Sequence, residues 1–85
     1  MNNEFTFPLT MGKIKGKFKI NKVKGKQEIV KYLENLGFIK GAEIVILEIS
    51  NKGAIVKIQN SKIALDDNIC KNILISELKI QEHSM

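Results

Sequence analysis

The residue types that most often carry out chemistry are scarce in this chain of 85 residues. There is one Cys, Cys70, and one His, His83, which lies near the end of the sequence. Nucleophilic catalysis needs a nucleophile, a base and a group that orients the base, and no convincing trio can be assembled from these residues. We therefore predict that the protein is not an enzyme.

The adjacent carboxylates of Asp66 and Asp67 could offer oxygen ligands to a divalent cation. Asp also caps helices, and either residue could accept a backbone N–H at the start of a short helical turn through Cys70. We favour capping, because CxxC, HxxxH and Gly-rich phosphate-binding patterns are all absent from the sequence. We expect no metal site and no cofactor, and we interpret Cys70 as a small buried apolar residue.

Charge is distributed unevenly along the chain. All 14 cationic side chains are Lys, and nine of them lie in residues 1–40 beside only three acids. Arg is best suited to bidentate recognition of guanine and phosphate, so its absence argues against a specific nucleic-acid partner. The Lys excess would suit weak attraction to an anionic partner or surface, unless it reflects only a compositionally biased genome.

The length and the apolar runs are consistent with one small domain. A chain of 85 residues that is 44% apolar can bury a single core. The first residues lack the apolar core of a signal peptide, and no apolar run approaches the roughly 20 residues that cross a bilayer. A single Cys cannot form an internal disulfide, so we expect a cytoplasmic protein.

Lys and mostly apolar residues alternate from Lys13 to Ile20. A period of two predicts a half-buried strand, with Lys13, Lys15 and Lys17 toward solvent and the other side toward the core. Val23 breaks this alternation, which predicts a bulge or bend before the next turn.

Helical spacing follows and predicts a helix at about Gln27–Leu36. Gly37 comes directly after the last periodic residue and can supply the left-handed conformation that ends a helix. The apolar residues at this spacing are Ile29, Val30, Leu33 and Leu36.

Short strands separated by turns account for the rest of the chain. Asn51, Lys52 and Gly53 predict a tight hairpin turn. The predicted strands are 43–49, 54–59, 62–65 and 73–75. Such a pattern favours a mainly β fold, a small closed or partly closed antiparallel sheet with one short α-helix and a short C-terminal helical turn. The expected core is Leu33, Leu36, Ile44, Ile46, Val56, Ile58, Ile63 and Leu65.

The stretch 32–44, YLENLGFIKGAEI, resembles the central signature of the FeoA family of ferrous-iron transport proteins. A helix ends there in a Leu-Gly pair, and a second glycine precedes a strand. Residues 61–65 resemble the family's closing strand, and the resemblance covers about Pro8 to Ile75. It implies an SH3-like β-barrel. The signature residues are Leu33, Leu36, Gly37 and Gly41.

The resemblance also implies a function. It indicates an accessory protein of ferrous-iron uptake that docks onto a FeoB-type membrane GTPase, with partly exposed apolar residues in the loop after the helix and Lys side chains that steer the encounter. One departure is Lys31, in a neighbourhood where the family often has Arg. The expected docking residues are Phe38, Ile39, Lys40, Lys13, Lys15 and Lys17.

Alternatives to this function remain open at this point. One is a nucleic-acid or ribosome-associated SH3-like module, and another is a stand-alone regulatory domain related to metal-dependent repressors. Homo-oligomerisation and weak association with the inner face of the membrane are also compatible with the sequence. The expected organisation is a flexible N-terminus over residues 1–7, the domain over 8–76 and a flexible tail over 77–85.

Overall fold

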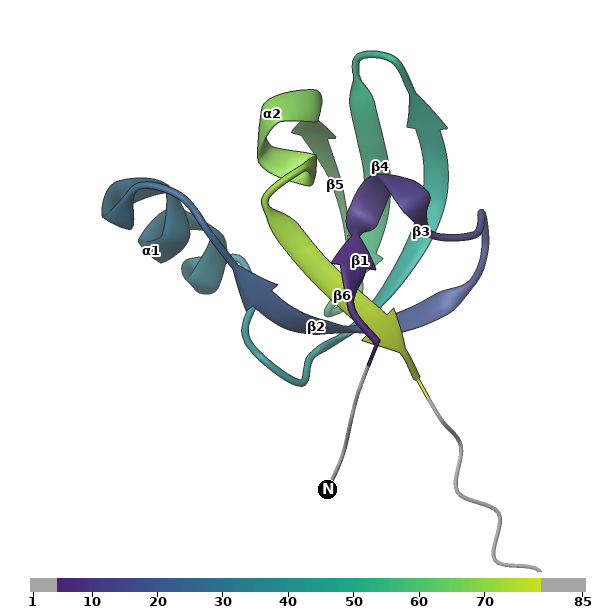
Figure 1. The fold of residues 1–85 in the computed structure, drawn as a ribbon, viewed down its shortest axis with the longest axis horizontal. Coiled ribbons are helices and arrows are strands. Elements are labelled where there is room, and N and C mark those ends of the chain that lie inside the picture. The colour runs from purple at the N-terminus through teal and green to yellow at the C-terminus, as the bar shows by residue number, and fades with distance from the viewer. Residues whose placement is uncertain (1–4, 79–85) are drawn as a thin grey trace, which may run out of the picture.

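The computed structural model describes residues 5–78. The predicted flexible ends therefore lie largely outside the described residues, as does His83. The described part contains six strands, two α-helices and one short 3-10 helix (Figure 1). In chain order they are β1 (Phe7–Pro8), η1 (Leu9–Met11), β2 (Lys17–Val23), α1 (Gln27–Asn35), β3 (Glu43–Ser50), β4 (Gly53–Ile58), β5 (Ser61–Asp66), α2 (Asp67–Cys70) and β6 (Ile73–Glu77).

All six strands form one antiparallel sheet in the order β1-β6-β2-β3-β4-β5. The prediction of a mainly β, SH3-like fold with one short helix and a C-terminal helical turn is confirmed. The sheet is not closed, because β1 and β5 stand at its two ends without pairing to each other. The alternative of a fully closed barrel is therefore wrong. β6 pairs with both β1 and β2, so the last described strand lies between the first two.

Local turn chemistry explains the two hairpins. β3 and β4 meet with Ser50 opposite Gly53, at the turn expected from the sequence. β4 and β5 are joined through Gln59 and Asn60, which both have positive φ, at 50° and 65°. Two consecutive positive φ values are typical of the type I′ turn, whose twist matches that of the flanking strands.

The predicted strand from Lys13 to Ile20 is wrong in its first half. β2 begins at Lys17, and Lys15 adopts a φ of +67°, which interrupts extended backbone. Ile14, which was expected to face the core, is 47% exposed. The predicted bulge is present, as the register between β2 and β6 shifts between Ile20 and Lys22.

One apolar core fills the inside of the curved sheet. Of the eight predicted core residues, six are buried, while Leu36 and Ile63 are partly buried and pack against it. Cys70 is buried, as expected. The buried apolar side chains are Leu9, Phe18, Ile20, Leu33, Phe38, Ile44, Ile46, Ala54, Val56, Ile58, Leu65, Cys70, Ile73 and Ile75. Within residues 5–78, no helix has the length and apolar character that crossing a membrane requires.

Candidate docking site

Helix α1 projects from the sheet at the end of β2 (Figure 1). Leu33 is its one buried residue, and it connects the helix to the core. The helix ends as the sequence predicts, because Gly37 takes a φ of +108° and its N–H donates to the Glu34 carbonyl at 3.0 Å. Apart from Leu33 and the half-buried Val30, the residues of the helix are exposed to solvent.

Phe38 corrects the sequence analysis. It was expected to lie partly exposed in a docking loop, but it is fully buried. Its N–H donates back to the Leu33 carbonyl at 2.9 Å, and with the left-handed Gly37 this reverses the chain. The ring therefore joins the core and cannot act as an exposed anchor.

The next two residues have the exposure that was expected. Ile39 is 49% exposed and Lys40 is exposed. The loop that carries them is attached to β2 by two backbone hydrogen bonds, from Gly41 N–H to the Ile20 carbonyl at 2.7 Å and from Ile20 N–H to the Ala42 carbonyl at 2.9 Å. Ile39 is thus presented by an ordered support, which lowers the entropy lost on binding.

A hollow of about 430 Å³ lies between α1, this loop and the end of β2. We call it the α1 hollow. Its wall combines half-buried Val side chains, the exposed Ile39, two Lys and one Glu, so it offers both apolar and charged groups. The residues used below are Lys22, Val23, Val30, Glu34, Ile39 and Lys40.

A second hollow, of about 240 Å³, separates α1 from α2. Ile29 and Leu33 from α1 and Ile69 from α2 give it an apolar wall, and Lys24 and Lys26 lie at one side. The sequence analysis did not foresee it, because its two walls come from segments far apart in the chain. Tyr32, also on α1, is 59% exposed and was likewise not singled out.

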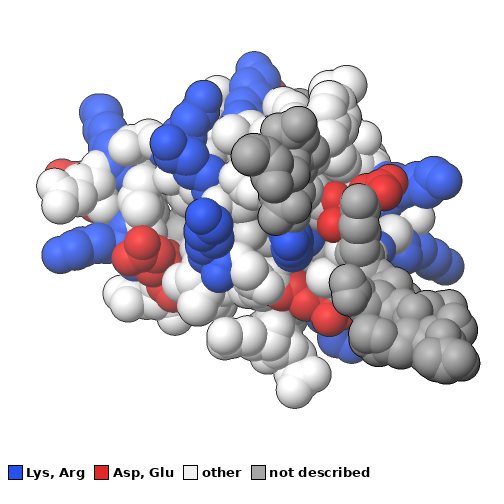
Figure 2. All heavy atoms as spheres, turned by 60° about the horizontal axis from the view of Figure 1, so that its bottom comes forward, with Lys and Arg blue, Asp and Glu red and all other residues white. Residues whose placement is uncertain are grey.

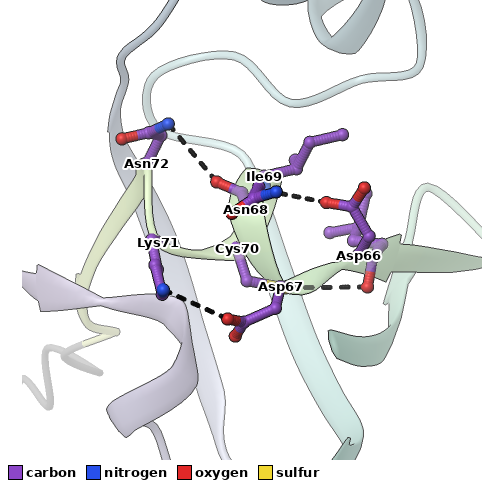
Figure 3. A network of polar contacts seen from close by, with 8 residues as sticks. Asp66, Asp67, Asn68, Ile69, Cys70, Lys71 and Asn72 are labelled. Carbon is purple, nitrogen blue, oxygen red and sulfur yellow. Dashed lines mark hydrogen bonds and ion pairs between the residues drawn. The ribbon is translucent and has the colours of Figure 1, made fainter. Parts of the chain in front are cut away.

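Asp66 and Asp67, the possible ligands of a divalent cation, are both engaged in local contacts (Figure 3). Asp66 accepts a hydrogen bond from Ile69 N–H at 2.9 Å and caps α2, which confirms one of the two capping alternatives. Asp67 forms an ion pair with Lys71 at 3.2 Å. Residues 5–78 contain no cluster of three His, Cys, Asp or Glu side chains that could hold a metal ion. The expected absence of a metal site remains a prediction.

Cys70 lies beneath the same turn. Its Sγ donates to the Leu65 carbonyl at 3.8 Å. Burial raises the pKa of its thiol to about 11, and the carboxylates of Asp67 and Asp66 contribute in the same direction. At neutral pH the group is a protonated thiol, which is a poor nucleophile and a poor metal ligand.

The predicted docking residues do not form one surface. Lys13, Lys15 and Lys17 are exposed, but they lie before and at the start of β2, whereas α1 follows the end of that strand. In Figure 1 the loop that leads into β2 and helix α1 are at opposite ends of the strand. Met11, at 71% exposure, and Ile14 accompany the three Lys and were not predicted as surface residues.

These features define a small SH3-like β domain with two exposed surfaces that combine apolar and Lys side chains. A family model described as the FeoA domain matches residues 7–77. The chain therefore belongs to the FeoA family, whose members are small accessory domains related to iron transport and do not form a known enzyme family. No curated protein sequence compared with the chain matches it.

Solved structures share the fold at low sequence identity. The FeoA protein from Chlorobium tepidum has a TM-score of 0.79 at 18% identity, over 91% of this chain and 75% of that one. A FeoA-like protein from Clostridium acetobutylicum has a TM-score of 0.75 at 19% identity, over 98% of both chains. A manganese-dependent transcriptional repressor has a TM-score of 0.82 at 11% identity, over 92% of this chain but 45% of its own. This relates the domain structurally to metal-dependent repressors.

Proposed function

We propose that this protein is a cytoplasmic accessory domain of ferrous-iron uptake that acts by docking onto the cytosolic part of a FeoB-type membrane GTPase. The observation that carries the proposal is the FeoA match over residues 7–77. The α1 hollow, with its half-exposed Ile39, is the docking surface that we assign to this function.

Three properties of the α1 hollow support this assignment. Ile39 is an apolar side chain held by a hydrogen-bonded loop, so little conformational freedom is lost when a partner covers it. Val23 and Val30 extend the apolar area around it. Lys22 and Lys40 also line the hollow and are exposed, and exposed charges raise the association rate with an acidic partner more than they raise affinity.

A matched pair of variants tests the proposal. Ile39 and Ile14 are the same residue type with nearly equal exposure, 49% and 47%, but Ile14 precedes β2 and Ile39 follows α1. Binding is measured against the purified cytosolic domain of the transporter. Ile39→Ser should weaken it by about 1 to 3 kcal/mol, mainly through faster dissociation, while Ile14→Ser should leave it unchanged.

The possible outcomes test the docking surface and the function separately. Equal affinity of the wild type and a folded Ile39→Ser variant would remove the α1 hollow as the docking surface. No measurable binding of the wild type at micromolar concentration would contradict the function itself. Circular dichroism of each variant checks that the fold is retained.

The likeness to metal-dependent repressors suggests a second candidate, a regulatory domain that works apart from a DNA-binding unit. The likeness covers 45% of the repressor, and the described residues of this chain hold two α-helices, of which α2 has four residues. The FeoA match favours the transport function. Binding to the transporter's cytosolic domain distinguishes the two.

A further inference from the structure

The segment from Met11 to Lys17, here called the Met11–Lys17 loop, exposes apolar and cationic side chains together. Met11 is 71% exposed and Ile14 is 47% exposed. The three Lys between and after them are also exposed: Lys13, Lys15 and Lys17. Large apolar side chains on a surface usually mark a contact with another molecule when they cluster.

The loop is held in place by its backbone. Gly12 N–H donates to the Leu9 carbonyl at 3.0 Å, and Gly16 N–H donates to the Lys13 carbonyl at 2.9 Å. Lys15 N–H donates across to the Ile46 carbonyl of β3. Lys15 adopts a φ of +67°, a conformation that a non-glycine residue rarely takes and that the surrounding bonds must maintain.

In the sequence, all charged residues in and around the loop are cationic. Residues 5–27 contain seven Lys and no acidic residue. No carboxylate in the described part of the chain lies within ion-pair distance of the three loop Lys. The acids on neighbouring strands are Glu43, opposite Lys19, Glu77, opposite Phe18, and Glu48, two residues beyond Ile46 on β3. Figure 2 shows Lys side chains spread along the face it presents, with acidic side chains in smaller groups between them.

We propose that the Met11–Lys17 loop binds the surface of an anionic phospholipid bilayer. Met11 and Ile14 enter the interfacial region, while Lys13, Lys15 and Lys17 contact the negatively charged headgroups. Apolar residues flanked by Lys are the pattern of interfacial membrane binding, in which buried apolar area and attraction to anionic lipids add together.

Two observations favour a bilayer over an acidic protein. Met11 is the last residue of η1 and Ile14 lies in the loop before β2, and neither side chain lines the α1 hollow or the hollow between the helices. A fluid bilayer can receive such side chains without a shape-matched pocket. The loop is also separated from α1 by β2, whose seven residues span about 23 Å at about 3.3 Å each. A membrane and a protein partner could therefore be bound at once, so the inference goes beyond the proposed function.

The test uses the whole chain and vesicles without any protein partner. One set contains phosphatidylglycerol mixed into phosphatidylcholine, and the other contains phosphatidylcholine alone. The wild type should sediment with the anionic vesicles, should not sediment with the neutral ones, and should be released by high salt because the attraction is screened. Absence of binding to the anionic vesicles at low salt would overturn the proposal.

Variants separate the loop from general basicity. Changing Lys13, Lys15 and Lys17 to Gln should lower vesicle affinity by roughly a hundredfold, since each Lys near an anionic surface contributes about fivefold. The control changes Lys52, Lys57 and Lys62 to Gln, which removes the same charge from other exposed positions. Lys52 lies on the turn after β3, Lys57 on β4 and Lys62 on β5. It should have a much smaller effect. Equal losses in both triple variants would show attraction by net charge alone and would contradict a loop-specific site.

Apolar variants complete the test. The double change Met11→Ser and Ile14→Ser should lower affinity by about tenfold, whereas Ile39→Ser should leave vesicle binding unchanged. An unchanged double variant would exclude insertion of the loop. If the double variant instead lost binding to the transporter's cytosolic domain and kept vesicle binding, the loop would be a protein-docking surface and the membrane proposal would be wrong.

Discussion

The carboxylate of Asp66 accepts a hydrogen bond from the backbone N–H of Ile69 at 2.9 Å, and this bond begins the turn that covers Cys70. Asp66 is also the last residue of β5, so the strand passes into the helix without a connecting loop. Cys70 is fully buried at the end of that turn. The contact thus joins the edge of the sheet to the layer that covers the core.

Removal of this cap should destabilise the domain measurably. Asp66→Ala should lower the free energy of unfolding by about 1 kcal/mol, because the first N–H groups of α2 lose their acceptor. Asp67→Ala is the matched control, since it removes one negative charge and only an exposed ion pair with Lys71. We expect a loss of about 0.5 kcal/mol or less for it. Urea unfolding of both variants measures the difference, and equal effects would mean that the cap does not stabilise the turn.

Phe38 and Ile39 should differ sharply in their effects on stability. Phe38→Ala should cost about 3 to 5 kcal/mol, because a fully buried ring is removed from the core. Ile39→Ala should cost about 0.5 kcal/mol or less, because that side chain is half exposed. Thermal or urea unfolding tests this. A Phe38→Ala variant as stable as the wild type would show that the ring does not contribute to the core.

The stability of the protein should depend on Cys70 at high pH. Burial raises the pKa of this thiol from 9.0 to about 11, so the folded state favours the protonated form. The resulting stabilisation is fully present below pH 9 and is lost as the pH rises through about 11. Unfolding curves over this range should show the loss in the wild type. Cys70→Ala provides the reference, because it lacks the thiol.

A thiol reagent gives a second check on Cys70. The native protein at neutral pH should react slowly, because the sulfur is buried and protonated. Addition of denaturant should bring the rate to that of an exposed thiol. Rapid labelling without denaturant would contradict the burial of Cys70.

Ser76 should be dispensable for folding. Its Oγ is buried, and it has no hydrogen-bond partner among the described residues. An unpaired buried hydroxyl loses its hydration without compensation, so Ser76→Ala should raise the free energy of unfolding by about 1 kcal/mol. Ser50→Ala is the contrasting variant, since the Ser50 Oγ accepts a hydrogen bond from Lys52 N–H at 3.1 Å and its loss should be slightly destabilising. A destabilised Ser76→Ala variant would indicate a bound water or an unrecognised partner.

Local signals predicted most of the elements. Helical spacing and Gly37 placed α1 to within one residue of its observed end, because a left-handed glycine stops a helix wherever the rest of the chain lies. The hairpin at Gly53 and the cap at Asp66 depend on neighbouring residues in the same way. β1 was not predicted, because two residues carry no periodic pattern and become a strand only when β6 is beside them.

The docking residues show where local reasoning fails. Phe38 and Ile39 are adjacent and both apolar, and no local pattern indicates which of them is buried. The tertiary structure decided this through the reversal at Gly37 and the bonds that attach the loop to β2. Likewise, the alternation from Lys13 suggested a strand, but the contact of Lys15 with β3 made this segment an exposed loop.

The amino-acid sequence by itself therefore determined the family, the mainly β architecture, the helix and its end, and the excess of Lys in the first half. These follow from composition and from interactions within a few residues. Only the tertiary structure decided the order of the strands and the open ends of the sheet. It also created the hollow between α1 and α2 and separated the α1 hollow from the Met11–Lys17 loop. Each of them depends on contacts between segments that are distant in the chain, such as β6 between β1 and β2, and a local pattern carries no information about such contacts.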